Sequence, residues 1–171
     1  QKYTAAVSGE LTLVADYPLD LQLKLNAPDM VPNMAEQQDI QLEVNLANSL
    51  RQLDIDTRIK GAVAAIIKGR VQPLDEKLPV NVVVNAPVLG WPLDTRAQVS
   101  ASNSIVAIDG TLSDYSLTVT SNISGEQMPI TSIQLGGRVN TERLSLPQIA
   151  VATLSGTING SAQLSWKDLL T

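Results

Sequence analysis

Apolar residues occupy every second position over most of the chain, and this alternation predicts β-strands with one apolar face. The clearest strips begin at Pro18 and Lys77, where PLDLQLKLNAP and KLPVNVVVNAP alternate and then stop at Asn-Ala-Pro. Pro and Gly interrupt the strips at intervals of roughly 8–12 residues, the spacing typical of an all-β domain. The pattern predicts roughly eleven or twelve strands and lacks the strand–helix–strand rhythm of a parallel α/β sheet.

Some stretches fit more than one element. Leucines between residues 34 and 53 also follow a helical stripe, but we interpret this stretch as a strand because Ile40 and Val44 complete the alternation and are β-branched. A short helical turn near residues 32–38 and a helix start at the C-terminal SWKDLL remain open, and residues 61–69 are ambiguous. The proline-bearing stretches 26–36 and 85–94 are predicted to be loops.

A second pattern lies within the predicted strands. The order polar residue, Gly, polar residue, aliphatic residue recurs in SGEL, KGRV, DGTL, GGRV and SGTI. A strand glycine permits a bulge or a sharp coil, so its repetition on successive strands would bend a broad sheet. Isolated bulges or turns account for the motif as well.

The apolar strips must either be covered by another part of the protein or contact a bound guest. With a period of two residues, roughly thirty Leu, Ile and Val side chains share one face of the sheet. A sheet that folds over completely would give a closed sandwich or small barrel. A sheet that curls into a trough would leave the aliphatic face open to a guest. The periodicity does not decide between them, and the rarity of open apolar troughs favours the closed core.

Composition narrows the chemistry. The 171 residues carry a formal net charge of −5, and the basic residues are scattered singly, which argues against nucleic acid and anionic lipid headgroups as electrostatic partners. Cys and His are absent, which removes disulfides, the common zinc and haem sites and a Ser-His-Asp triad. No apolar run is long enough to span a membrane. Both ends resemble cuts in a longer protein, so we expect any membrane anchor outside residues 1–171.

Carboxylates are the remaining candidates for chemistry. Asp54 and Asp56 share one strand face, and Asp39 and Glu43 belong to the strand expected beside it, so Ca²⁺ binding or glycoside hydrolysis is one interpretation. The other is an ordinary polar strand face whose charge is balanced by Arg51 and Arg58. No G-x-S-x-G elbow and no phosphate-binding glycine loop occurs. We therefore expect no enzyme activity, no metal and no cofactor.

The alternating strands with their glycines, the paired LKLNAP and VVVNAP units and the long stretch that begins NVVVNAPVLGWPLDTRAQVSASNSIVAIDGTL resemble the TamB family of Gram-negative bacteria. The similarity is to the C-terminal part of that family and covers the whole chain, residues 1–171. It implies a periplasmic segment of a protein anchored in the inner membrane, with the anchor and the extreme C-terminus outside this chain. It also implies partnership, through other parts of the protein, with the outer-membrane barrel protein TamA in the translocation and assembly module.

The resemblance further implies a broad, curled, non-closed β-sheet with an aliphatic concave face, as in AsmA-like and bridge-like lipid-transfer proteins. Such a groove shields phospholipid acyl chains between the two membranes, or nascent outer-membrane protein and autotransporter segments. The alternative is a closed β-sandwich that serves only as a structural spacer. The residues expected to line the groove share one phase on successive strands: Leu21, Leu23, Leu25, Ile40, Leu42, Val44, Leu46, Val80, Val82, Val84, Val106, Ile108, Leu117 and Val119.

Overall fold

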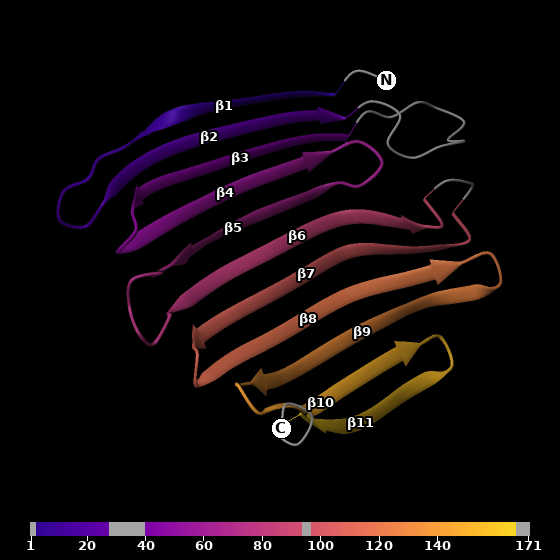
Figure 1. Cartoon of the computed structure of the whole chain (residues 1–171). Helices are drawn as coiled ribbons and strands as arrows, with labels where there is room; N and C mark the ends of the chain where they lie inside the picture. The colour runs from indigo at the N-terminus through magenta and orange to yellow at the C-terminus, as the bar shows by residue number, and fades with distance from the viewer. Residues whose placement is uncertain (1–2, 28–39, 94–96, 167–171) are drawn as a thin grey trace.

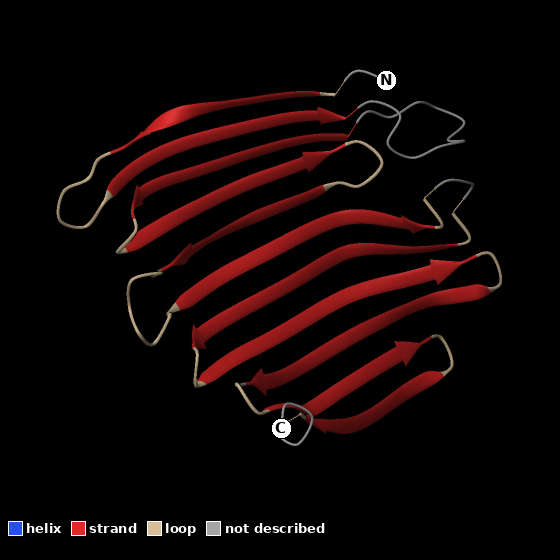
Figure 2. Ribbon diagram, in the orientation of Figure 1, coloured by secondary structure: helices blue, strands red, loops and turns tan. Residues whose placement is uncertain are grey.

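A computed structural model describes residues 3–27, 40–93 and 97–166. Every regular element in these ranges is a β-strand (Figures 1 and 2). The strands are β1 (Thr4–Leu11), β2 (Pro18–Ala27), β3 (Ile40–Ser49), β4 (Gln52–Lys60), β5 (Ala65–Val71), β6 (Val80–Trp91), β7 (Val99–Thr111), β8 (Asp114–Gly125), β9 (Met128–Val139), β10 (Arg143–Thr153) and β11 (Gly156–Ser165). This result confirms the all-β prediction.

The strands form one antiparallel sheet in which spatial order equals sequence order, from β1 to β11. Each strand pairs only with the strands before and after it, and β1 and β11 are the outer strands of the sheet formed by this chain. The sheet is therefore not closed on itself. Its strands bend along their length, most visibly β6, β7 and β8 in Figure 1.

Burial confirms an open sheet rather than a sandwich. The accessible surface is 11445 Å², whereas a compact monomer of this mass exposes about 8,100 Å². Among the described residues only Leu19, Ala27, Ala65 and Ala86 are buried apolar residues, and Thr57 is the one buried polar residue. The side chains of a single sheet have lateral neighbours but no opposing layer, so most of them are half-buried.

Both ambiguous stretches contribute strand residues inside the described ranges, although residues 61–64 precede the strand. Residues 40–53 form β3 and the start of β4, as the β-branched positions predicted, and the end of the 61–69 stretch enters β5 at Ala65. The helical turn left open at 32–38 and residues 167–170 of the SWKDLL stretch lie outside the described residues.

The predicted loop at 85–94 is wrong, because β6 continues through it to Trp91. Ala86 pairs with Ser104 and Val88 pairs with Ser102, so the ladder skips only the proline between them. The partner strand is irregular at this point, since Asn103 has φ 51° and the β7–β8 register shifts there. Pro87 is thus tolerated where no ladder hydrogen bond requires its missing N–H.

The glycine of KGRV occupies the middle of β5. Gly69 faces Ile55 on one side and Val82 on the other without a register shift, so an isolated bulge is the wrong explanation here. A Cβ added to Gly69 would lie 2.7 Å from Val82 Cα and would meet the Asn81 carbonyl oxygen. The glycine therefore allows an approach between β5 and β6 that any side chain would prevent.

Candidate functional site

One face of the sheet is aliphatic across its full width. Side chains of directly paired residues project from the same face, so the register identifies which residues share it. One row crosses all strands from β1 to β11: Val7, Leu23, Val44, Thr57, Ile67, Val84, Val106, Val119, Leu135, Ile149 and Gly160. We call this side of the sheet the aliphatic face.

All fourteen residues expected to line a groove lie on the aliphatic face. Leu23, Val44, Val84, Val106 and Val119 belong to the row that crosses the sheet. The other nine belong to parallel rows on either side of it, as their pairings show: Leu21 with Leu46, Leu25 with Leu42, Ile40 with Ala27, Val82 with Ile108, Ile108 with Leu117, and Val80 with Gly110. Each of the fourteen is half-buried. The structure thus brings them together on one surface, and their binding role remains a proposal.

The sequence prediction of the groove omitted β1, β4, β5, β9, β10 and β11. The aliphatic face also includes Ile55, Ile67, Leu135 and Ile149 from these strands. In β5 the alternation was hidden because Gly69 occupies an apolar position between Lys68 and Arg70. The alternation of Ile67, Gly69 and Val71 was the signal that could have identified this strand.

No second layer covers the aliphatic face within the described residues, because the extensive contacts of each strand are with its neighbours in the sheet. Exposure is greatest where one lateral neighbour is missing: Val7 on β1 is 72% exposed and Ile158 on β11 is 71% exposed. Polar groups on this face are partly satisfied internally, since Ser104 Oγ lies 2.8 Å from Ser121 Oγ on the next strand. The result is a continuous, partly exposed apolar surface.

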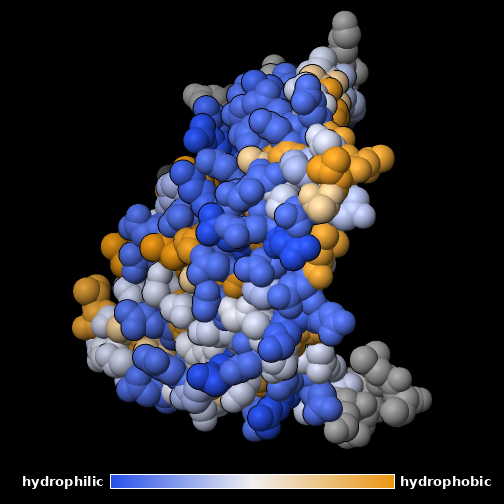
Figure 3. Space-filling view, turned by 90° about the vertical axis from the view of Figure 1, so that its left-hand side faces the viewer, coloured by the Kyte–Doolittle hydropathy of each residue, from blue (hydrophilic) through white to orange (hydrophobic). Residues whose placement is uncertain are grey.

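The opposite face is polar and carries most of the ion pairs. Arg70 Nε donates to Asp54 Oδ1 at 2.7 Å, and Lys68 Nζ lies 3.5 Å from Asp56 Oδ2. The hydrogen bond from Arg70 lowers the pKa of Asp54 below its ordinary value of 3.8. Figure 3 shows one side of the molecule, with hydrophilic residues over its centre and hydrophobic residues at its margins.

These contacts favour the interpretation of the carboxylates as a balanced polar face. Arg58 Nη2 lies 3.6 Å from Asp56 Oδ2, so Arg58 balances this carboxylate as predicted. Arg51 instead forms an ion pair with Asp16, with Nε 2.6 Å from Oδ1. Within the ranges that the structure describes, no group of three or more acidic, His or Cys side chains is placed to hold a metal ion. Asp39 lies outside those ranges.

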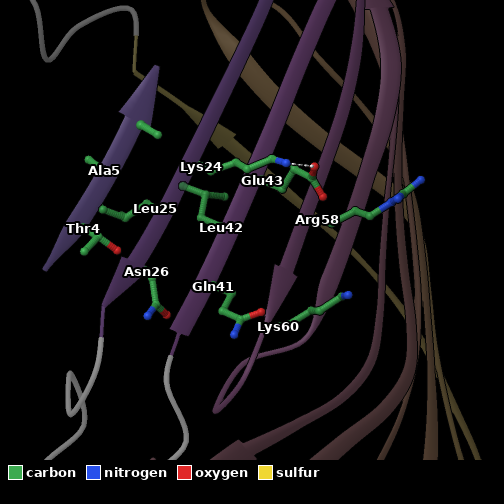
Figure 4. A pocket seen from close by; sticks show the side chains of 11 residues that line it. Thr4, Ala5, Lys24, Leu25, Asn26, Gln41, Leu42, Glu43, Arg58 and Lys60 are labelled. Carbon is green, nitrogen blue, oxygen red and sulfur yellow. Dashed lines mark ion pairs between the residues drawn. The ribbon is translucent and has the colours of Figure 1, made fainter. Parts of the chain in front are cut away.

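A pocket of about 320 Å³ lies among β1, β2, β3 and β4, and most of its lining side chains belong to the polar face (Figure 4). Two neighbouring rows of paired residues build it. The first row is Ala6, Lys24, Glu43 and Arg58, and the second is Thr4, Asn26, Gln41 and Lys60. The sequence pattern does not predict this pocket, because its residues meet only through the register of four strands.

The fold and the site together define a class: an open antiparallel sheet that presents an uncovered aliphatic surface. The family model described as "TamB, N-terminal domain" matches residues 1–171, and the chain belongs to the TamB family. The matching model is that of the N-terminal domain, so the expected match to the C-terminal part is not confirmed.

A similar protein is the translocation and assembly module subunit TamB of Haemophilus influenzae, which is 22% identical over 167 residues. The match covers 94% of this chain and 13% of that protein, so the chain spans a small part of its relative's length. No solved structure matches the chain. In the part of the chain that the structure describes, no helix has the length and hydrophobicity of a membrane span.

Proposed function

We propose that the aliphatic face shields phospholipid acyl chains from water, as a periplasmic segment of a translocation and assembly module. In this proposal the chain is part of a protein anchored in the inner membrane of a Gram-negative bacterium and partnered by TamA through other regions. The observation that carries it is the row of paired residues from β1 to β11, aliphatic except at Thr57 and Gly160, with no covering layer in the described residues. No catalytic group is required, because shielding needs only apolar contact.

The energetics support this use. Exposing an acyl chain to water costs about 0.8 kcal/mol per CH₂ group, or about 12 kcal/mol for sixteen carbons. A chain lying on an open sheet touches protein on one side, so contact recovers about half of that cost. Neighbouring strands are about 4.8 Å apart, so the ten intervals between eleven strands give a surface about 48 Å long measured along the sheet. Apolar contact is thus available at every step along this length.

A second candidate is an apolar segment of an unfolded outer-membrane protein. The specific observation in its favour is that β1 and β11, the outer strands of the sheet formed by this chain, are exposed at every residue. An incoming strand that paired with either edge would extend the sheet and add its own apolar residues to the same face.

The test uses adjacent residues that project from opposite faces of β8. Val119 lies in the aliphatic row, and Thr118 lies on the polar face between Ala107 and Gly136. We expect Val119→Arg to weaken binding of a phospholipid carrying a fluorescent acyl chain about tenfold, because a charged side chain displaces about two CH₂ contacts. Thr118→Arg is the matched control and should leave the affinity within about twofold, because a polar-face arginine stays solvated.

Measuring peptide binding and phospholipid binding to the same variants distinguishes the two candidate cargoes. If an alternating apolar–polar peptide binds in a Val119-dependent manner and the phospholipid does not, the cargo is polypeptide. If neither ligand binds the wild-type chain, the aliphatic face has only a structural role and the proposal fails. Equal loss in both variants would also contradict it, because binding would then not depend on the aliphatic face.

A further inference from the structure

The pocket on the polar face has an excess of positive charge in an acidic chain. Lys24, Arg58 and Lys60 line it, against the single carboxylate of Glu43, whereas the whole chain has a formal net charge of −5. Including Asp56, which pairs with both Arg58 and Lys68, still leaves four cations facing two carboxylates. The local field therefore attracts an anion.

The two rows of the pocket differ in how their cations are matched. In the first row, Lys24 Nζ lies 3.5 Å from Glu43 Oε1. In the second row, Lys60 is flanked by Gln41 and then Asn26, which are neutral, and no ion pair of Lys60 occurs within the described residues. Several other polar-face cations have a carboxylate partner, as Arg138 has Asp114 at 2.8 Å. A cation without a carboxylate partner among the described residues thus lines the pocket.

A second observation concerns hydrogen bonding. The Oδ1 atom of Asn26 is buried and has no hydrogen-bond partner among the described residues. A buried acceptor without a donor is costly, and a ligand that supplies an O–H or N–H group would remove that cost. Asn26 is the neighbour of Gln41 in the row that contains Lys60. The acceptor and the available cation therefore belong to one site.

We propose that this pocket binds a phosphate group whose ligand also carries a hydroxyl or ammonium donor. Lys60 and Arg58 would bind the phosphate oxygens through charge-assisted hydrogen bonds, which the planar Arg58 guanidinium can make in pairs. The donor on the ligand would satisfy Asn26 Oδ1. Free phosphate and a phospholipid headgroup share this chemistry. The inference does not depend on the cargo of the aliphatic face, because most of the pocket's lining belongs to the other side of the sheet (Figure 4).

The test titrates the 171-residue chain with inorganic phosphate at low ionic strength and follows backbone amide shifts by NMR. We expect Lys60→Gln to weaken binding about threefold or more, the range of a partly exposed charge pair. Lys77→Gln removes the same charge from the β5–β6 loop and serves as the matched control. It should leave the affinity unchanged, and added salt should weaken wild-type binding.

Vesicle sedimentation distinguishes the two sources of phosphate. Binding to phosphatidylglycerol vesicles, but not to phosphatidylcholine vesicles, that requires Lys60 would assign the site to headgroups. Binding of inorganic phosphate alone with the same requirement would assign it to free phosphate. The proposal is overturned if neither probe binds, or if Lys60→Gln and Lys77→Gln have equal effects. Should Lys60→Gln fail to fold, wild-type shifts confined to Asn26, Gln41 and Lys60 support the site, and dispersed shifts overturn it.

Discussion

The substitution Val82→Arg measures whether the aliphatic face is open. Val82 is half-buried near the start of β6, between Gly69 and Ile108. Full burial of a valine stabilises by about 1.5–3 kcal/mol, so losing a half-buried one costs about 1 kcal/mol. The lower β-propensity of arginine adds up to about 1 kcal/mol. Since the guanidinium reaches water above an uncovered face, we expect a total loss of about 1–2 kcal/mol.

A covered face would give a different result. An unpaired charge forced into a closed core costs several kcal/mol, a large part of the 5–15 kcal/mol by which domains are stable. Urea unfolding followed by circular dichroism measures the loss from the shift in midpoint. Val83→Arg places the same side chain on the opposite face, between Lys68 and Ala107, and is the matched control. An unfolded Val82→Arg variant beside a folded Val83→Arg variant would refute the open face.

Two further predictions concern an ion pair and a glycine. Because Arg70 lowers the pKa of Asp54 in the folded state, this pair stabilises the fold above about pH 4 and loses its effect as the pH falls through the lowered pKa. The difference in urea midpoint between wild type and Arg70→Gln should thus be present at pH 7 and shrink as the pH falls below about 4, and a difference that stays constant in acid would contradict the assignment. Gly69→Ala should destabilise by about 2 kcal/mol or more, because its Cβ meets the backbone of β6. Gly160→Ala, where the added Cβ has no neighbour within 4 Å, should leave the thermal midpoint nearly unchanged, and equal shifts would disprove the close approach.

The strands could be predicted from the sequence because alternation is a local signal. Leu21, Leu23 and Leu25 alternate with Asp20, Gln22 and Lys24, and the same phase recurs in β3 and β6. A shift of one residue would bring the polar set onto the aliphatic face, so the hydrophobic pattern itself specifies the register. For this reason the expected groove residues all share one face in the structure.

Other features depended on information that is not local. Alternation is identical in a sandwich and in an open sheet, so the absence of a covering layer could not be read from the leucines and valines. Pro87 indicated a loop, yet the irregular strand opposite accommodates it within β6. The pocket required Lys24 and Lys60, 36 positions apart in the sequence, to lie on nearby strands of one face. Only the pairing of β2, β3 and β4 brings them together.

The meander order of the sheet allows the aliphatic face to change in length by whole hairpins. Because each strand pairs only with its sequence neighbours, inserting or deleting a hairpin leaves every remaining pairing intact. Each hairpin lengthens or shortens the sheet by about 9.6 Å, twice the spacing of adjacent strands. Evolution can thus adjust the reach of this molecule in steps of two strands, much as repeat proteins gain or lose units, without redesigning a core.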